Sequence, residues 1–426
     1  MVVPAPAADA ESAPLSFVTE TSPGRHTIDT DPGDTAANVK LALVTETFPP
    51  DINGVALTFG RIARELARRG HEVTVYHPLR PAAVASPAIA PYRQVALPGF
   101  PLPGYPQLRF GFPAWRQLER RFRADPPDLV HVVTEGPLGA SAVSVARRLQ
   151  IPVTSSFHTN FHVYMRHYRV PLLRRAALGW LRRVHNRTAC TFAPTTGLGS
   201  ELAADGFRRL RLLSRGIDRH HFSPARREAQ LRQRWGATAD APVVLHVGRL
   251  APEKDYPLLF QTFAAMRAAD PRCRFVLVGD GPLRVSLERA HPECRFTGFL
   301  PPDELAAHYA SADIYIHASR SETFGNVLVE ALASGLAVAG FDYAAAQQLI
   351  HSGRHGLLVP LDRPDLLVHA AVRLVHEPAL RAQLRRFAPD AVAAHSWDRV
   401  IDGFERELLH LAGTASASRP LAATCP

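Results

Sequence analysis

The 426-residue sequence is poor in cysteine pairs and in long apolar runs, and each shortage excludes a class of protein. Its cysteines, at 190, 273, 294 and 425, are scattered and form no CxxC pair. This pattern argues against a disulfide framework or a zinc site and favours reduced thiols in the cytoplasm. No stretch reaches the roughly 18 uninterrupted apolar residues of a membrane-spanning helix. We therefore expect a cytoplasmic protein with an ordinary hydrophobic core.

Lysine is almost absent, because only Lys40 and Lys254 are lysines among the 49 basic residues. The basic residues are also unevenly spread. Residues 39–222 carry 26 basic and 11 acidic side chains, a net charge of +15, whereas residues 223–395 carry 19 and 18, a net charge of +1. A basic half indicates an anionic partner such as a lipid surface, an acidic acceptor or nucleic acid. An arginine-rich solvated surface is the alternative.

The length is too great for one ordinary core, so we expect two domains. Residues 1–38 are rich in Ala, Pro, Ser and Thr, and they lack the basic start and apolar core of a signal peptide. We interpret them as a disordered tail. The expected units that follow are a first domain at 39–222, a second domain at 223–395, a helix at 396–413 that packs back on the first domain, and a flexible tail at 414–426.

Short β-branched runs alternate with helical patterns throughout, which predicts an α/β protein with doubly wound parallel sheets. One expected helix is TFGRIARELARRG (58–70), and ASAVSVARRLQ (140–150) is another. The expected strands of the first sheet are 40–46, 71–77, 128–133 and 151–158. Those of the second sheet are 242–248, 273–279, 313–319, 336–342 and 356–359. Ligands of such sheets bind at the carboxyl ends of the strands.

Two loops after expected strands carry candidate anion-binding residues. In FPPDINGVALTFGRIA a turn at Gly54 precedes a helix, whose first backbone N–H groups suit an anion. In HVGRLAPEKDYPLLF, Arg249 and Lys254 lie between a strand and a helix. A compact ammonium on a flexible stem suits a phosphate oxygen. An ordinary loop and a pair of surface cations are the respective alternatives.

The segment SRSETFGNVLVEALASG (319–335) places two acids among small and apolar residues. Glu322 is expected in a loop, and Glu330 on a helix that begins near Gly325. Free N–H groups at that helix start would favour a phosphate, and carboxylates accept hydrogen bonds from hydroxyl groups. The pattern therefore favours a sugar–phosphate ligand. A capping role for Glu322 and an arginine pair for Glu330 are the alternatives.

These segments together resemble the retaining glycosyltransferases of family 4, which have the GT-B architecture of two Rossmann-like domains facing across a cleft. The resemblance covers roughly residues 40–411, and ETFGNVLVEALASG is similar to the family's signature of two glutamates separated by seven residues. Other similar segments, in the same order, are PPDINGVALTFGRIARELARRGHEV, RGIDRHHFSP, HVGRLAPEKDYPLL and VGDGPLR. Within the family, FHTNFHVYMRHY followed by HNRT and RGID is most similar to bacterial GDP-mannose-dependent α-mannosyltransferases. Lipid-sulfoquinovose synthases are similar too.

The resemblance implies a donor site on the second domain. Glu322 would accept hydrogen bonds from the donor sugar, which Phe324 and Gly325 would help to seat. The backbone N–H groups of Asn326 and Val327 would bind the β-phosphate. Asn326 departs from the apolar residue that is usual in the family, and a backbone contact tolerates this change. The residues implied to contact the base are Thr297, Gly298, Phe299 and Leu300.

Further roles follow from the same resemblance. Glu330 would hold the ribose hydroxyls, and Arg249 and Lys254 would bind the diphosphate. Gly54 would allow close approach of the first domain to the sugar, and His158 would lie near the reacting centre on the acceptor side. Negative charge develops on the departing diphosphate, and preorganised cations would stabilise it. No pair of glycosidase-like carboxylates is placed to attack, and we expect no obligatory metal or other cofactor.

The sequence therefore favours a hexosyltransferase that moves mannose from GDP-mannose to a lipid-linked or glycan acceptor. A UDP-sugar-dependent glycolipid synthase is the runner-up. A nucleotide-sugar epimerase and a non-enzymatic two-lobed sugar-binding protein are weaker alternatives. Nucleic acid is not expected as a partner, because Glu322 and Glu330 would repel phosphates. The basic first domain suggests peripheral contact with an anionic membrane at its cytoplasmic face.

Overall fold

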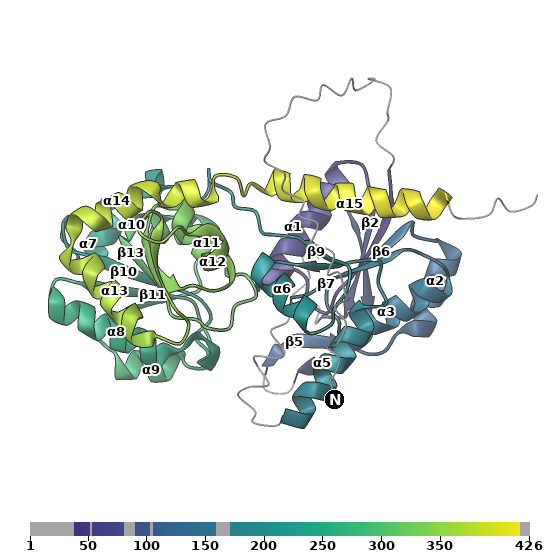
Figure 1. Cartoon of the computed structure of the whole chain (residues 1–426), viewed down its shortest axis with the longest axis horizontal. Helices are drawn as coiled ribbons and strands as arrows, with labels where there is room; N and C mark the ends of the chain where they lie inside the picture. Colours follow the sequence, from purple (N-terminus) through teal and green to yellow (C-terminus); the bar gives the residue numbers. More distant parts are fainter. Residues whose placement is uncertain (1–37, 52, 81–89, 103–104, 159–170, 418–426) are drawn as a thin grey trace, which may run out of the picture.

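The computed structural model describes residues 38–51, 53–80, 90–102, 105–158 and 171–417 (Figure 1). Almost all of the two expected tails lies outside these residues, as do the residues of FHTNFHVYMRHY that follow His158. The described chain forms two parallel sheets covered by helices, which confirms the expected α/β class. None of the described helices combines the length and apolarity needed to cross a bilayer.

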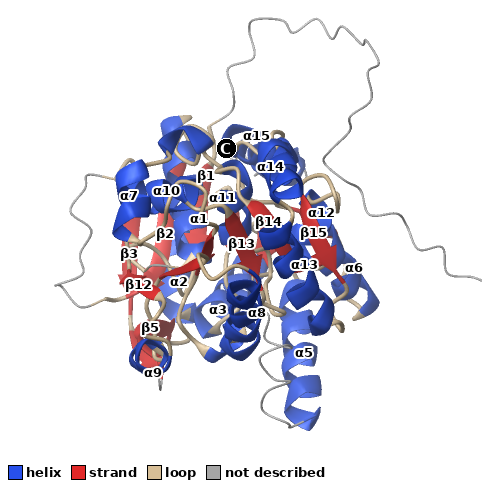
Figure 2. Ribbon diagram, turned by 90° about the vertical axis from the view of Figure 1, so that its left-hand side faces the viewer, coloured by secondary structure: helices blue, strands red, loops and turns tan. Residues whose placement is uncertain are grey.

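The first sheet has seven parallel strands in the order β3-β2-β1-β6-β7-β8-β9. The strands are β1 (Lys40–Val44), β2 (Glu72–Pro78), β3 (Arg93–Leu97), β6 (Leu129–Val132), β7 (Val153–Ser156), β8 (Thr191–Ala193) and β9 (Leu210–Leu212). The helices of this domain are α1 (Gly54–Arg68), α2 (Trp115–Ala124), α3 (Pro137–Arg148), α5 (Pro171–His185) and α6 (Thr196–Ala204). An antiparallel hairpin of β4 (Gly99–Leu102) and β5 (Tyr105–Gly111) is added after β3. Figure 2 shows α5 extending away from the sheets.

Helix α1 begins four residues before the expected Thr58. The side chain of Asn53 accepts hydrogen bonds from the backbone N–H groups of Val55, at 3.1 Å, and Ala56, at 2.9 Å. Such an N-cap satisfies donors that a helix start leaves free. The cap therefore moves the helix start to Gly54, close to the end of β1.

The second sheet has six parallel strands in the order β12-β11-β10-β13-β14-β15. They are β10 (Val243–Val247), β11 (Arg274–Val278), β12 (Arg295–Gly298), β13 (Ile314–His317), β14 (Ala337–Phe341) and β15 (Gly356–Val359). The helices are α7 (Ala229–Arg234), α8 (Tyr256–Ala269), α9 (Arg284–Ala290), α10 (Pro302–Ser311), α11 (Asn326–Ala333), α12 (Ala344–Leu349), α13 (Pro364–His376) and α14 (Pro378–Phe387). Short 3-10 helices are η2 (Pro224–Arg226), η3 (Pro252–Lys254) and η4 (Ala388–Val392). Two hydrophobic clusters contain most of the buried apolar side chains of this domain.

The last helix, α15 (Trp397–Ala417), returns to the first domain and lies along its α1 side (Figure 1). Its Phe404 is 1% exposed and meets the ring of Phe59 edge-on at 6.4 Å. The chain crosses between the domains twice, and the two crossings are joined by a 2.7 Å hydrogen bond from the N–H of Ile217 to the carbonyl of His395. The expected domain limits at residues 222 and 395 stay predictions.

Among the described residues, two further contacts join the two domains apart from these crossings. A Cβ atom on Gly54 would lie 3.3 Å from Nδ2 of Asn326, so the starts of α1 and α11 are close together. The N–H of Thr196, at the start of α6, donates to Oε1 of Gln348 on α12 at 3.2 Å. Figure 1 shows α6 and α12 side by side between the sheets.

Candidate active site

The loops after β10 and β11 are pinned to one another at the carboxyl edge of the second sheet. The N–H of Leu250 donates to the carbonyl of Asp280 at 3.0 Å, and the N–H of Leu283 donates to the carbonyl of Leu250 at 2.9 Å. Gly279 has φ of +133°, and a Cβ atom there would lie 2.0 Å from the carbonyl oxygen of Gly248. The Gly248 backbone therefore packs so closely on Gly279 that only glycine fits at position 279, and this contact supports the loop that carries Arg249.

Lys254 and Glu322 form an ion pair at this edge, which joins η3 to the loop after β13. Both side chains are mostly buried, at 17% and 15% exposed. Burial by itself raises the pKa of Glu322, but the Lys254 ammonium more than offsets this and the pKa falls to about 2. Two further contacts tie the same segments: Ser321 Oγ donates to the carbonyl of Glu253 at 3.3 Å, and Arg320 pairs with Asp255 at 3.1 Å. The carboxylate is therefore ionised and held in place at neutral pH.

Arg249 lies in the same loop, five residues before Lys254. Its carbonyl accepts a hydrogen bond from the hydroxyl of Tyr256 at 3.1 Å, which anchors the loop to α8. Two histidines line the strand ends beneath: His246 of β10 and His317 of β13 are 2% and 5% exposed. Burial lowers the pKa of His246 to about 3 and that of His317 to about 4, so both are neutral at pH 7. The formal positive charges here thus come from Arg249, Lys254 and Arg320, the last of which pairs with Asp255.

The start of α11 follows Glu322 directly. Gly325 has φ of +104° and ψ of 63°, the left-handed region that favours glycine, and a Cβ atom on it would lie 3.8 Å from both Glu322 Cγ and His317 Nε2. No side chain among the described residues caps α11, so within them the N–H groups at its start lack the usual capping acceptor. Phe324 is 3% exposed and belongs to the hydrophobic core, so its own contribution to a ligand would come from its backbone.

Glu330 lies further along α11 and is paired with a tyrosine. The hydroxyl of Tyr309, on α10, donates to Oε2 of Glu330 at 2.9 Å and lies 3.2 Å from the carbonyl of Val327. Burial raises the pKa of Glu330 to about 7, and the Tyr309 hydrogen bond opposes this only in part. The alternative of an arginine partner for Glu330 is wrong, because the described hydrogen bond comes from a tyrosine.

The residues expected at the base lie at the end of β12, the edge strand beside β11. Gly298 has φ of +76°, and its carbonyl accepts from the N–H of Gly279 at 2.9 Å and from Thr297 Oγ1 at 3.0 Å. Phe299 is 60% exposed, whereas Leu300 packs against the core. The segment is thus joined to the Gly279 loop and presents one aromatic side chain to solvent.

His158 follows β7, at the carboxyl edge of the first sheet, and is 7% exposed. Its ring centroid is 5.3 Å from that of Phe59 on α1. Burial and the nearby charge of Arg215 lower the pKa of His158 well below its usual value. Nη2 of Arg215 lies 3.1 Å from Nδ1 of His158. The structure thus brings Lys254 and Glu322 together on the second domain, and places His158 on the first.

Comparisons with known proteins agree with this architecture. Residues 52–221 match the family described as Glycosyltransferase Family 4, and residues 241–377 match the one described as Glycosyl transferases group 1. A GDP-mannose-dependent alpha-mannosyltransferase of Mycobacterium tuberculosis is 36% identical over 371 residues, which cover 85% of this chain and 94% of that protein. This chain belongs to glycosyltransferase family 4. It is therefore an enzyme of the hexosyltransferase kind.

Two further similarities are lower in sequence identity. The sulfoquinovosyl transferase of Arabidopsis thaliana is 28% identical over 380 residues, covering 86% of this chain and 72% of that protein. Among solved structures, a sucrose-phosphate synthase from Thermosynechococcus elongatus is similar with a TM-score of 0.69 and 19% identity, over 88% of this chain and 99% of that one. This likeness shows the shared fold and confirms the GT-B architecture.

The sequence did not identify several polar residues of this glycosyltransferase site. Tyr309 and Arg215 lie 21 and 57 residues from the side chains they contact, and neither segment has a spacing that signals the contact. His246 and His317 could have been found, because each lies two residues before the end of an expected strand, 242–248 or 313–319, near the edge where ligands bind.

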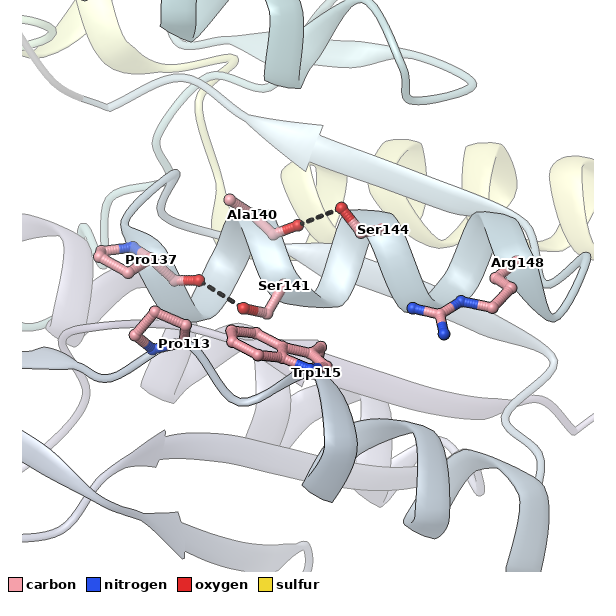
Figure 3. A pocket seen from close by; sticks show the side chains of 7 residues that line it. All are labelled: Pro113, Trp115, Pro137, Ala140, Ser141, Ser144 and Arg148. Atoms are coloured by element: carbon pink, nitrogen blue, oxygen red, sulfur yellow. Dashed lines mark hydrogen bonds between the residues drawn. The ribbon is translucent and has the colours of Figure 1, made fainter.

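A surface pocket lies away from these residues, between α2 and α3 of the first domain (Figure 3). It is lined by Pro113, Trp115, Pro137, Ala140, Ser141, Ser144 and Arg148. The hydroxyls of Ser141 and Ser144 donate to the carbonyls of Pro137, at 2.8 Å, and Ala140, at 3.0 Å, so both are used within α3. The pocket contains none of the predicted site residues.

Proposed function

We propose that this enzyme transfers mannose from GDP-mannose, with retention of configuration, to a hydroxyl group of a lipid-linked or glycan acceptor. The observation that carries the proposal is the Lys254–Glu322 ion pair beside the start of α11. In this proposal the cation of the pair would bind phosphate, and the carboxylate beside it would accept hydrogen bonds from hydroxyl groups. The M. tuberculosis relative that is 36% identical bears the name of a GDP-mannose-dependent enzyme, which supports the choice of donor.

The leaving diphosphate would be bound from three sides of the same edge. Arg249 and Lys254 supply positive charge, and the first N–H groups of α11, from Asn326 and Val327, supply aligned dipoles. Preorganised donors of this kind stabilise charge that develops on a departing oxygen. The departing phosphate would in turn assist deprotonation of the acceptor on the same face of the sugar. No step of this account needs a metal ion.

The sugar and the nucleoside would be recognised by acceptors and close backbone contacts. Glu322, ionised at neutral pH, would accept hydrogen bonds from sugar hydroxyls, and Glu330 would accept those of the ribose. Gly54 lies against the side chain of Asn326, so the first domain approaches the start of α11 closely and would come near the sugar there. The edge segment Thr297–Leu300 would contact the base.

The Lys254–Glu322 pair would favour binding of the whole nucleotide-sugar, with both its diphosphate and its sugar, over a nucleoside diphosphate. A phosphate that reaches Lys254 must share the ammonium with Glu322, and sugar hydroxyls can then satisfy the carboxylate. An ammonium has three N–H donors, so it can keep the carboxylate and still bind a phosphate oxygen. A nucleoside diphosphate has no sugar hydroxyls to donate hydrogen bonds to the buried Glu322 carboxylate. It should therefore bind more weakly than the whole nucleotide-sugar.

A UDP-sugar-dependent glycolipid synthase is the second candidate. The observation in its favour is the set of relatives at 26–28% identity, which includes the Arabidopsis sulfoquinovosyl transferase and an alpha-monoglucosyldiacylglycerol synthase of Streptococcus pneumoniae. Both candidates use the same site residues and differ in the base and the sugar. Family membership speaks against the epimerase and the non-enzymatic sugar-binding protein.

The acceptor side supports a membrane partner. Two aromatic side chains are solvent-exposed here: Phe112, three residues before α2, at 49%, and Trp115, the first residue of α2, at 47%. Exposed Arg116 and Arg120 follow them on the same helix. Exposed aromatic residues beside cations favour the interface of an anionic bilayer. We infer peripheral contact of the first domain with the cytoplasmic face of the membrane, where a lipid-linked acceptor would be presented.

The proposal is tested by comparing Glu322→Ala and Glu330→Ala with the wild-type enzyme. Hexose transfer from GDP-mannose to vesicles that contain diacylglycerol and monoglucosyldiacylglycerol is followed by mass spectrometry, together with GDP release. Glu322→Ala should abolish transfer, and Glu330→Ala should chiefly raise the KM for the donor. Exposed Glu304→Ala, on α10, is the control and should leave both unchanged. Full activity of both site variants would refute the assignment.

A further inference from the structure

Arg215 is a buried cation that the proposed reaction does not use. It is 4% exposed and lies three residues beyond β9, while His158 lies two residues beyond β7. Both strands are parallel members of the first sheet, so their carboxyl ends meet at one edge. The resulting contact is a 3.1 Å hydrogen bond between Nη2 of Arg215 and Nδ1 of His158. No ion pair joins Arg215 to a carboxylate of the described chain.

The chemistry of this contact fixes the protonation of the ring. A guanidinium has five N–H donors and no acceptor, so Nδ1 of His158 must accept with its lone pair. An imidazolium has a proton on both nitrogens and could not accept. A neutral ring with its proton on Nδ1 could not accept there either. The contact with Arg215 therefore selects one form, the neutral ring with its proton on Nε2.

The surroundings of His158 reinforce this choice from each neighbouring element. From α1 the ring meets Phe59, and the titratable groups are His131 of β6, His185 of α5 and Arg215 itself. His131 and His185 are buried, and burial lowers the pKa of each to about 3, so they are neutral. No carboxylate of the described residues acts on the ring to favour its charged form.

The backbone that carries Arg215 is held rigidly. A Cβ atom on the next residue, Gly216, would lie 2.5 Å from the Cα atom of Trp397, so the two crossings between the domains are in close contact there. The following residue, Ile217, donates its N–H to the carbonyl of His395 at 2.7 Å. A fixed backbone and a buried side chain give Arg215 little freedom to leave His158.

We propose that Arg215 is a positioning residue that holds His158 neutral with its proton on Nε2, so that the imidazole takes part in transfer as a hydrogen-bond donor and not as a base. Nε2 of His158 and Nη1 of Arg215 are both buried and have no acceptor among the described residues. An oxygen of the bound substrate, a hydroxyl or an anionic oxygen, is the acceptor that the Nε2–H of His158 fits. The inference rests on the proposed function for its kinetic consequence alone.

The first test reads the protonation of His158 without any substrate. The full chain is labelled with nitrogen-15 in histidine, and the His158 signals are assigned by their loss in His158→Asn. Long-range proton–nitrogen correlation spectra should show a single form with the proton on Nε2, unchanged from about pH 5.5 to 8. A wild-type spectrum that shows a proton on Nδ1, or titration to imidazolium within this pH range, would by itself overturn the proposal.

The second test changes Arg215 and compares Arg215→Leu, Arg215→Lys and, as a control, exposed Arg208→Leu. The leucine variant should show a mixture of the two neutral forms of His158. It should also lower the kcat for GDP release from GDP-mannose about tenfold and change KM less than about twofold, as expected when one aligned hydrogen-bond donor is lost. The lysine variant keeps a donor and should recover part of both. Arg208→Leu should match the wild type.

The outcomes distinguish the positioning role of Arg215 from the proposed transfer of mannose from GDP-mannose. An unchanged His158 spectrum in Arg215→Leu would contradict the positioning role, whether or not activity falls. A melting curve measured by circular dichroism identifies variants that have not folded. If Arg215→Leu is one of them, the spectra of Arg215→Lys and of the wild type still test the positioning role. If the spectra behave as stated but the wild type releases no GDP from GDP-mannose, the proposed donor is wrong and the positioning role stands.

Discussion

Glu330 is the residue whose charge is most sensitive to the state of the site. Its pKa is raised to about 7 in the folded enzyme because burial disfavours the carboxylate, whereas the ordinary value is 4.5. Between these two values the folded chain holds a proton that the unfolded chain has released. Folding stability therefore falls as the pH rises from about 4.5 to 7. A ligand that donates hydrogen bonds to the carboxylate would reverse the shift.

This linkage predicts proton release on donor binding. Ribose hydroxyls that donate to Glu330 favour its ionised form, so GDP-mannose binding near pH 6.5 should release a fraction of a proton and binding near pH 8.5 should release none. Calorimetry in buffers of different ionisation enthalpy measures this number. Glu330→Gln keeps an acceptor for Tyr309 and should release none at either pH. Equal proton release by the wild type and the variant would show that Glu330 does not meet the ribose.

The same residue predicts a stability effect without ligand. Glu330→Gln removes the cost of an ionised buried carboxylate, so at pH 8 the free energy of unfolding should rise by on the order of 2 kcal/mol. The gain should shrink as the pH falls toward 4.5 and vanish below it, where the wild-type side chain is protonated in both the folded and the unfolded state. Urea unfolding at pH 5 and pH 8 measures the difference. A gain that is the same at both pH values would contradict the raised pKa.

At the scale of elements, a carboxylate at the start of β13 joins three helical segments of the second domain. Asp313 pairs with Arg227 at 2.8 Å and with Arg232 and Arg385 at 2.9 Å, and accepts from the N–H of Val243 at 3.0 Å. Burial raises the pKa of Asp313, but the three guanidinium charges outweigh it and the pKa is lowered. The stability from these pairs is present above pH 3.8 and is lost as the pH falls below it.

Removing this charge should be costly. Asp313→Asn leaves three guanidinium groups around a neutral amide, and we expect the free energy of unfolding at pH 7 to fall by about 3–5 kcal/mol, the usual cost of breaking a buried pair. Asp303→Asn is the matched control, because Asp303 also pairs with an arginine, Arg226 at 3.0 Å, but is 82% exposed. It should have no measurable effect. Equal effects of the two variants in urea titrations would refute the assigned role of Asp313.

The sequence predicted the central elements well and the edges poorly. Strands β1, β6, β10 and β13 are almost wholly buried runs of apolar residues, and the pattern found each of them. It missed β3, whose residues Arg93–Leu97 are mostly exposed, and β8, which has three residues, because neither has the length and apolarity that mark a buried strand. The hairpin of β4 and β5 was missed because Pro101 interrupts its first strand.

The site was predictable where one segment carries several groups and unpredictable where distant segments meet. Glu322, Gly325 and Glu330 share one strand–loop–helix unit, so their spacing could be interpreted directly. That Lys254 pairs with Glu322, 68 residues away, depends on loops after two adjacent parallel strands meeting at one edge. The contact of Arg215 with His158 depends on strands β7 and β9, which are separated by β8 in the sheet. Sequence spacing carries no signal for such pairs.

At the scale of the whole molecule, charge is concentrated on the first domain and should govern membrane contact. Vesicles of phosphatidylglycerol should bind the protein at low salt and release it near 0.5 M salt, where the screening length falls to about 4 Å. The double variant Arg116→Glu with Arg120→Glu should bind weakly even at low salt. Exposed Arg289→Glu on the second domain is the control and should bind like the wild type. Co-sedimentation gives the bound fraction, and salt-independent binding would contradict the electrostatic account.

The central claim is that the loops after β10 and β13 and the start of α11 bind GDP-mannose as one unit. Isothermal titration calorimetry of the wild-type enzyme with GDP-mannose, GDP, UDP-glucose and mannose tests it most directly. The account predicts one site, with GDP-mannose bound at least about tenfold more tightly than UDP-glucose, a difference of about 1.4 kcal/mol. Glu322→Ala should remove the preference for GDP-mannose over GDP. Tighter binding of UDP-glucose would move the donor to the second candidate, and the absence of binding by any nucleotide-sugar would contradict the account.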